Sequence, residues 1–134
     1  MSDSSDAVSK GEGYAVANLA DLGEGPGFRK IRKELGVTAF GVNAIMLPPT
    51  YETGSHFHDE QEELYFLHSG EVEFTFGDGS TQKLTPGGLA WVDAQTHRKV
   101  KNLSDSEEAV YVVVGGKDGY VGRDGNLSPG SEHR

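Results

Sequence analysis

Two histidines and a glutamate stand close together near the middle of the chain. His56 and His58 are separated by one residue, and Glu63 follows five positions after the second histidine. On a β-strand, residues i and i+2 point to the same face, so the two imidazoles would lie side by side. A carboxylate on the next strand would complete a set of two histidines and one carboxylate, which binds a divalent cation and leaves positions open. The spacing predicts a metal site, with Glu62 as the alternative carboxylate.

Other catalytic patterns are missing from the sequence. There is no Ser-His-Asp arrangement, no phosphate-binding glycine loop and no zinc-finger spacing. The acidic residues around Glu63 also have a simpler interpretation, because they could do no more than solvate a loop. The chemistry of the chain therefore depends on the histidine pair and on the strands that position it.

Short strand patterns separated by turns occur on both sides of this stretch. Residues 71–76 alternate polar and apolar, with Val72, Phe74 and Phe76 on the inward face. Residues 77–80 form a hairpin turn signal, and residues 81–84 are the expected return strand. Further strands are expected at residues 37–47, 64–67, 89–92, 97–102 and 109–114. With no convincing helix, this spacing is typical of an all-β sandwich or barrel.

Apolar residues at 37–47 occur on both parities of the expected strand. Both of its faces should therefore be covered, one by the core and the other by another subunit or sheet. The basic run at residues 29–33 is interpreted as a solvated face. Large apolar side chains elsewhere are expected to fill the barrel, among them Trp91, Phe74, Phe76 and Met46.

Composition limits the class of protein and its partners. A chain of 134 residues suits one domain, divided here into a disordered lead-in (1–12), a barrel (13–115) and a glycine-rich tail (116–134). The net charge of −9 disfavours nucleic acid or an anionic membrane as a partner. The chain has no cysteine and no apolar stretch long enough for a signal peptide or a membrane span, so we expect a cytoplasmic location.

The histidine stretch resembles the first motif of the cupin family. That motif is a histidine, one residue, a histidine, three or four residues, a glutamate, six residues and a glycine, and it is filled by His56, His58, Glu63 and Gly70. The glycine that usually stands six residues before the first histidine is replaced by Thr50. The resemblance implies a double-stranded β-helix, a jelly-roll barrel that holds a divalent metal (Fe, Mn, Ni or Zn) and commonly forms homodimers.

The second motif of the family matches less well. Counted from Gly87, its proline, glycine, histidine and asparagine positions hold Asp93, Gln95, Arg98 and Asn102. His97 stands one place before the histidine position, and a shift of one residue on a strand turns a side chain to the opposite face. The register therefore favours an inward Arg98, whereas a bulge or a shortened loop would return His97 to the site as a fourth ligand.

The resemblance implies a protein that acts on a small organic molecule inside the barrel. Dioxygenation is the first expectation, with isomerase or lyase chemistry as alternatives, because a fold does not decide a reaction. The competing hypothesis is a non-catalytic binding protein whose metal site is degenerate or absent, with Arg98 anchoring the ligand or pairing with the carboxylate. The candidate metal ligands are His56, His58, Glu63 and His97. The candidate substrate contacts are Arg98 and Tyr65.

Overall fold

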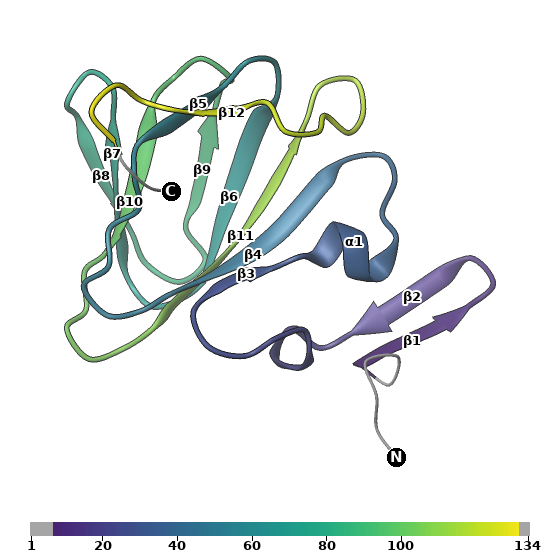
Figure 1. Cartoon of the computed structure of the whole chain (residues 1–134). Coiled ribbons are helices and arrows are strands. Elements are labelled where there is room, and N and C mark those ends of the chain that lie inside the picture. The colour runs from purple at the N-terminus through teal and green to yellow at the C-terminus, as the bar shows by residue number, and fades with distance from the viewer. Residues whose placement is uncertain (1–6, 132–134) are drawn as a thin grey trace.

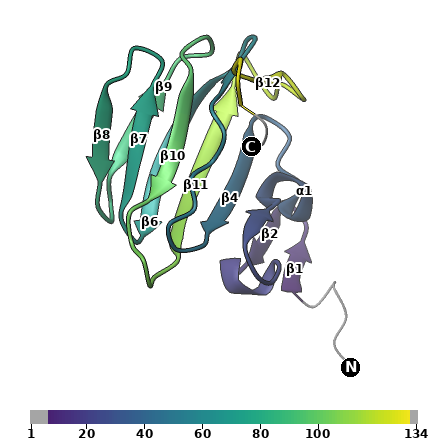
Figure 2. The same ribbon diagram turned by 60° about the vertical axis from the view of Figure 1, so that its left-hand side comes forward.

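The computed structural model describes residues 7–131 and contains two five-stranded antiparallel sheets that face each other (Figure 1, Figure 2). The first sheet consists, in spatial order, of β3 (Gly27–Arg29), β4 (Gly41–Leu47), β11 (Ala109–Gly116), β6 (Glu62–Ser69) and β9 (Leu89–Val92). The second consists of β12 (Gly125–Leu127), β5 (His56–His58), β10 (Arg98–Asn102), β7 (Val72–Phe76) and β8 (Thr81–Leu84). The prediction of an all-β double-stranded β-helix is confirmed.

The core lies between the two sheets and follows the alternation of the strands. Val72 and Phe74 of β7 are buried, and Phe76 packs against the same cluster, as the sequence predicted. Strand β8 has the predicted bounds, and the turn before it is closed by Asp78, whose side chain accepts hydrogen bonds from the backbone N–H and the hydroxyl of Ser80. Local pattern was sufficient here because the hairpin needs no distant partner to set its register.

The N-terminal part of the chain has more regular structure than expected. Strands β1 (Val8–Gly11) and β2 (Tyr14–Ala17) form a hairpin that lies apart from the two sheets (Figure 1). The expected disordered lead-in therefore includes a strand, while residues 1–6 lie outside the described residues. A 3-10 turn, η2 (Leu19–Asp21), and a one-turn helix, α1 (Ile31–Leu35), follow.

Helix α1 occupies the basic run that was interpreted as a solvated face. It ends at Gly36, which adopts a left-handed conformation (φ 79°) and donates its backbone N–H to the carbonyl of Arg32. A glycine in this position is a common helix stop, and lysine or arginine in the last turn complements the helix dipole. The helix packs against β4.

The outer face of the first sheet is covered at one edge and exposed at the other. Ala44 and Met46 of β4 point outward and are buried on the side where the N-terminal segment and α1 lie. The outward residues of β6 and β9 pair across strands and remain exposed; we call them the outer apolar strip: Leu64, Phe66, Leu89 and Trp91. The expectation that Trp91 fills the barrel was wrong, because 63% of its surface is exposed.

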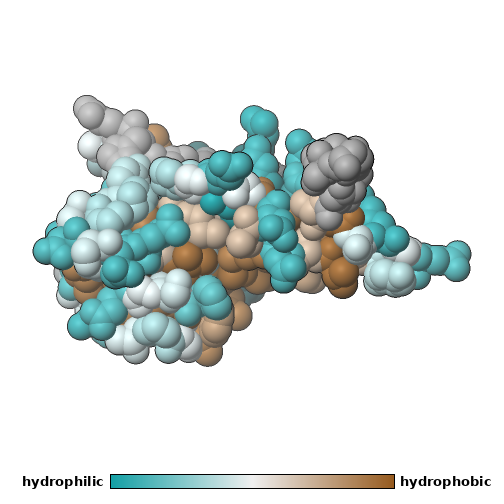
Figure 3. Space-filling model, turned by 90° about the horizontal axis from the view of Figure 1, so that it is seen from below, coloured by the Kyte–Doolittle hydropathy of each residue, from teal (hydrophilic) through white to brown (hydrophobic). Residues whose placement is uncertain are grey.

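The C-terminal segment contributes a strand where an irregular tail was expected. Strand β12 pairs with β5 along its whole length and forms one edge of the second sheet. From below, hydrophobic side chains gather in the middle of the surface, with hydrophilic ones around them (Figure 3). Within residues 7–131, no helix has the length and apolar character needed to cross a membrane.

Candidate metal centre

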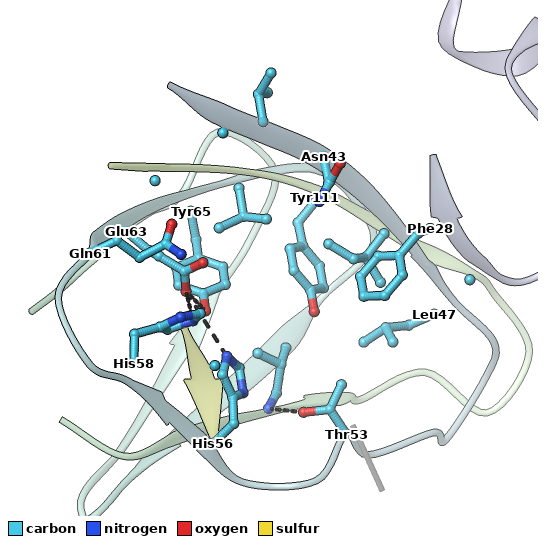
Figure 4. Close-up of a pocket in the computed structure, with 18 of the residues that line it drawn as sticks. Phe28, Asn43, Leu47, Thr53, His56, His58, Gln61, Glu63, Tyr65 and Tyr111 are labelled. Atoms are coloured by element: carbon cyan, nitrogen blue, oxygen red, sulfur yellow. Dashed lines mark hydrogen bonds and ion pairs between the residues drawn. The ribbon is translucent and has the colours of Figure 1, made fainter. Parts of the chain in front are cut away.

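The structure brings His56, His58 and Glu63 together inside the barrel. The histidines lie on β5 and the glutamate on β6 of the opposite sheet, and one ligand atom from each lies within 4.8 Å of the others (Figure 4). The Nε2 atoms of His56 and His58 are 4.0 Å and 3.3 Å from Oε1 of Glu63. The two imidazole rings lie side by side, with 5.1 Å between their centroids, as their spacing predicted.

Glu63 is held in place by two donors behind it. The Tyr65 hydroxyl donates to Oε1 at 2.7 Å, and the Arg98 guanidinium donates to the same oxygen at 3.1 Å. Burial alone would raise the pKa of Glu63, but hydrogen bonding and attraction to His58, with help from Tyr65 and Arg98, lower it to about 2. Glu63 is therefore an ionised carboxylate with a fixed orientation. Burial also raises the pKa of Tyr65 well above its usual value, so its phenol remains a donor.

Arg98 faces the barrel interior, as the strand register predicted, and it is completely buried. Apart from Glu63 and the Tyr65 hydroxyl, its guanidinium donates to the backbone carbonyls of Ala94 and Thr96, at 3.3 Å and 2.6 Å. Each nitrogen therefore already has a protein acceptor, and Arg98 is not part of the pocket wall. In this arrangement Arg98 is the counter-ion of Glu63, one of the two roles considered for it.

His97 points away from the other candidate ligands. Its Nδ1 lies 2.6 Å from the hydroxyl of Ser128, and its ring stacks on Phe57 with 4.3 Å between centroids. Among the described residues, the cluster that could hold a metal ion contains His56, His58 and Glu63 and does not include His97. The strand starts at Arg98 without a bulge that would turn His97 inward.

A residue that sequence reasoning missed holds His58 from the other side. Oδ1 of Asp124 lies 2.8 Å from Nδ1 of His58, while Oδ2 accepts the backbone N–H groups of Glu60 and Gln61 at 2.9 Å and 3.0 Å. Asp124 is 66 positions from His58 in a glycine-rich segment, and no local pattern marks it. Although burial would raise the pKa of Asp124, the hydrogen bonds from Gln61, Glu60 and His58 lower it far below its usual range.

These contacts determine what His58 offers to a ligand. An ionised carboxylate can only accept, so Nδ1 of His58 carries a proton, and the lone pair of the neutral ring is on Nε2. Burial lowers the pKa of His58, but hydrogen bonding and attraction to Glu63, together with Asp124, outweigh burial and raise it. Within the described residues, the buried Nε2 makes no hydrogen bond of good geometry, and its polar contact is the ion pair with Oε1 of Glu63 at 3.3 Å. Buried nitrogens rarely remain unpaired, so this atom is suited to a metal ion.

A cavity of about 560 Å³ adjoins the three residues. His56, His58 and Glu63 lie at one side of it, and Phe28, Leu47 and Tyr111 at the other (Figure 4). The hydroxyl of Tyr111 points into the cavity, and burial raises the pKa of this phenol, so it remains protonated. The volume fits a small organic molecule. The sequence predicted Tyr111 only as part of the apolar strand at residues 109–114, and the structure places it in the core with Val113 packed against the same cluster.

Known proteins share this fold and part of the sequence. A family model described as the cupin domain matches residues 44–115. A structure of DMSP lyases is similar at 26% identity (TM-score 0.58) over 66% of this chain and 44% of that one. A sugar phosphate isomerase from Silicibacter pomeroyi has 24% identity (TM-score 0.63) over 76% and 64%. A cupin protein from Bacteroides fragilis has 23% identity (TM-score 0.66) over 87% and 98%.

This chain matches only part of the DMSP lyase and isomerase chains. The chain spans about half of the DMSP lyase chain and just under two thirds of the isomerase. No curated protein sequence matches it significantly. The likeness to the isomerase and to the Bacteroides protein concerns the fold.

Proposed function

This chain belongs to the cupin family, and we propose that it binds a divalent metal ion through His56, His58 and Glu63 and acts on a small organic molecule in the adjoining cavity. The observation that carries this proposal is the buried Nε2 of His58, 3.3 Å from an ionised Glu63 and at the wall of a cavity of about 560 Å³. Imidazole and carboxylate ligands suit iron, manganese, nickel and zinc, so all four stay as candidate metals.

The residues of the site would have separate roles in holding the metal, orienting Glu63 and contacting the substrate. When bound, a divalent cation supplies Lewis-acid or redox chemistry at the positions that three protein ligands leave open. Arg98 and Tyr65 keep Glu63 ionised and oriented. The protonated Tyr111 phenol is placed to donate a hydrogen bond to a substrate oxygen. Tyr65 lines the cavity beside Glu63 and is the second proposed substrate contact. Apolar walls would exclude water from the bound molecule.

The reaction class has two branches. The sequence favours dioxygenation, since two histidines and one carboxylate form the ligand set of many non-haem iron oxygenases. Similarity to DMSP lyases and to a sugar phosphate isomerase supports lyase or isomerase chemistry instead. Oxygen uptake separates the branches, because a dioxygenase consumes oxygen with its substrate and a lyase or isomerase does not.

The alternative is a non-catalytic binding protein without a metal. One observation favours it: Arg98 already neutralises Glu63, with 3.1 Å between the guanidinium and the carboxylate, so the pocket does not require a cation to balance its charge. In that case the two histidines and Tyr111 would bind the ligand directly. Arg98 would act through Glu63, because its own donors are engaged by the chain.

Elemental analysis of the purified protein tests the metal directly. After growth in medium supplemented with iron, manganese, nickel and zinc, we expect close to one metal ion per chain. The double variant His56→Ala, His58→Ala should retain almost none, and His68→Ala, an exposed histidine on β6, should retain the metal of the original protein. Absence of metal from all three proteins would leave the metal-free binding protein as the better account.

We also propose that two copies associate through the outer apolar strip. Leu89 and Trp91 are 61% and 63% exposed, and they pair with Phe66 and Leu64 of β6 on the same face. In a chain with a net charge of −9, this uncharged strip is the surface where two copies repel each other least. Sheets pack face to face through such residues, and a twofold axis needs only one patch.

Light scattering on the purified protein tests this association. We expect a dimer, and a monomer for Leu89→Lys, with Thr81→Lys on the exposed edge strand β8 as the control. A monomeric original protein would contradict the proposal.

The lack of cysteine and the negative charge still support a cytoplasmic protein that binds neither nucleic acid nor anionic membranes.

A further inference from the structure

We infer that Asp124 is a positioning residue: its carboxylate holds Nδ1 of the His58 ring so that Nε2 faces Glu63 and the cavity. This inference rests on the proposed metal-binding function, but its geometric part concerns the protein alone. Asp124 lies outside residues 44–115, which the cupin domain model matches. The C-terminal segment of this chain would therefore be part of its metal centre.

Asp124 is itself rigidly held. It is only 7% exposed, and both of its oxygens accept hydrogen bonds. Oδ2 takes two backbone N–H groups, from Glu60 and Gln61, and the Gln61 side chain also donates to Oδ1, the oxygen that accepts Nδ1 of His58. A carboxylate with this many partners cannot rotate away from the imidazole without breaking several hydrogen bonds, so it fixes the ring and its tautomer.

The strand that follows Asp124 also holds the histidine strand. Strand β5 pairs with β10 at one position, His56 opposite Arg98, but it pairs with β12 at all three of its residues. In addition, the backbone N–H of Asp59 donates to the Asp124 carbonyl at 3.0 Å. The C-terminal segment thus supplies most of the ladder that keeps His56 and His58 side by side, and Asp124 adds the side-chain contact.

Such a contact changes the ligand strength of a histidine. A carboxylate that accepts the N–H of a metal-binding imidazole sets its orientation and raises its basicity, and its loss lowers metal affinity about 10- to 100-fold. We expect that loss for Asp124→Ala. Asp124→Asn should give a smaller one, since its amide oxygen still accepts the imidazole proton but carries no charge.

The test measures Zn²⁺ affinity by competition titration and, in metal-free protein, the nitrogen-15 shifts of the His58 ring. The first control is Asp118→Asn, which removes an exposed carboxylate from the same segment. The second is Asn126→Ala, which removes a β12 side chain that donates to Asp59 and to the backbone carbonyl of Asp124 but contacts neither the Asp124 carboxylate nor His58. In the original protein we expect His58 protonated at Nδ1, and in Asp124→Ala a shift toward protonation at Nε2. Both controls should keep the original affinity and shifts.

The outcomes separate the inference from the proposed function. Folded Asp124→Asn and Asp124→Ala proteins with unchanged Zn²⁺ affinity and unchanged His58 shifts would overturn the inference. If Asp124→Ala does not fold, the isosteric Asp124→Asn variant decides by the same two readouts. If the original protein does not bind Zn²⁺ but its His58 shifts respond to Asp124→Asn, the positioning role stands and the metal function fails.

Discussion

Two buried polar side chains inside the barrel, Asn102 and His58, differ in what the chain does with them. Asn102 is fully buried at one end of β10, and its amide donates to the carbonyls of Leu47, Pro48 and Glu107 and accepts the backbone N–H of Ser104. His58 is 5% exposed, and within residues 7–131 only its Nδ1 has a well-formed hydrogen bond, while Nε2 lies 3.3 Å from Oε1 of Glu63 and faces the cavity. A satisfied buried group indicates a structural role, and an unsatisfied one beside a cavity indicates ligand binding.

The largest effect on stability is expected for Asn102, the buried side chain with a structural role. Asn102→Ala removes the donor to three carbonyls and the acceptor for one N–H, so we expect the free energy of unfolding to fall by about 3–5 kcal/mol. Urea denaturation measures it, with the partly exposed Asn126→Ala, which loses two hydrogen bonds near the surface, as the control at about 1 kcal/mol. The folded fraction of Asn102→Ala should still bind metal. If Asn102→Ala lost metal binding but kept its stability, the assignment of a structural role to Asn102 would be wrong.

The pH dependence of stability tests the role of Glu63, the carboxylate beside His58. Its pKa is about 2 in the folded protein and 4.5 ordinarily, so its ionised form stabilises the metal-free fold above pH 4.5. This stabilisation is lost as the pH falls from about 4.5 toward 2. The difference of about 2.5 pKa units corresponds to about 3 kcal/mol.

The advantage of the metal-free original protein over Glu63→Gln should therefore shrink as the pH falls through this window. Denaturation at several pH values measures it. The control is Glu71→Gln, an exposed carboxylate 3.5 Å from Lys83, whose effect should stay below about 1 kcal/mol. An advantage that does not change between pH 5 and pH 2 would show that Glu63 is not held as an ionised partner of Arg98 and His58.

The smallest effect is expected for Tyr65→Phe. This change removes the hydrogen bond to Glu63 and a long one, 3.4 Å, that the hydroxyl accepts from Nε of Arg98, and it keeps the ring contacts with Phe74 and Tyr111, so stability should fall by about 1–2 kcal/mol. Tyr111→Phe is the matched control, because its hydroxyl points into the cavity, and it should cost less. A loss above about 3 kcal/mol for Tyr65→Phe would mean that the carboxylate depends on the tyrosine more than on Arg98.

Where the sequence predicted structure well, the information was local. The alternation in β7, the turn at Asp78 and the two-residue spacing of the histidines each determine geometry without a distant partner. The register argument that turned Arg98 inward also held, because β10 pairs regularly with β7 from Arg98 to Asn102.

The parts that sequence reasoning missed depend on contacts between distant segments. Asp124 reaches His58 across 66 positions, and β12 is a strand only because β5 offers it an edge. Trp91 was misplaced because β6 and β9 carry apolar residues on both faces, and periodicity alone does not say which face is inside. Helix α1 was not predicted because its charged residues were interpreted only as a solvated face, although a glycine such as Gly36 is a common helix stop.

Anomalous X-ray diffraction from crystals grown with zinc, with data collected at the zinc absorption edge, tests the central claim most directly. We expect one strong peak at about 2.0–2.2 Å from a nitrogen of His56, a nitrogen of His58 and an oxygen of Glu63, and no peak near Asn102. A zinc peak elsewhere in the protein, with no peak at these three residues and Glu63 still bound to Arg98, would contradict the account.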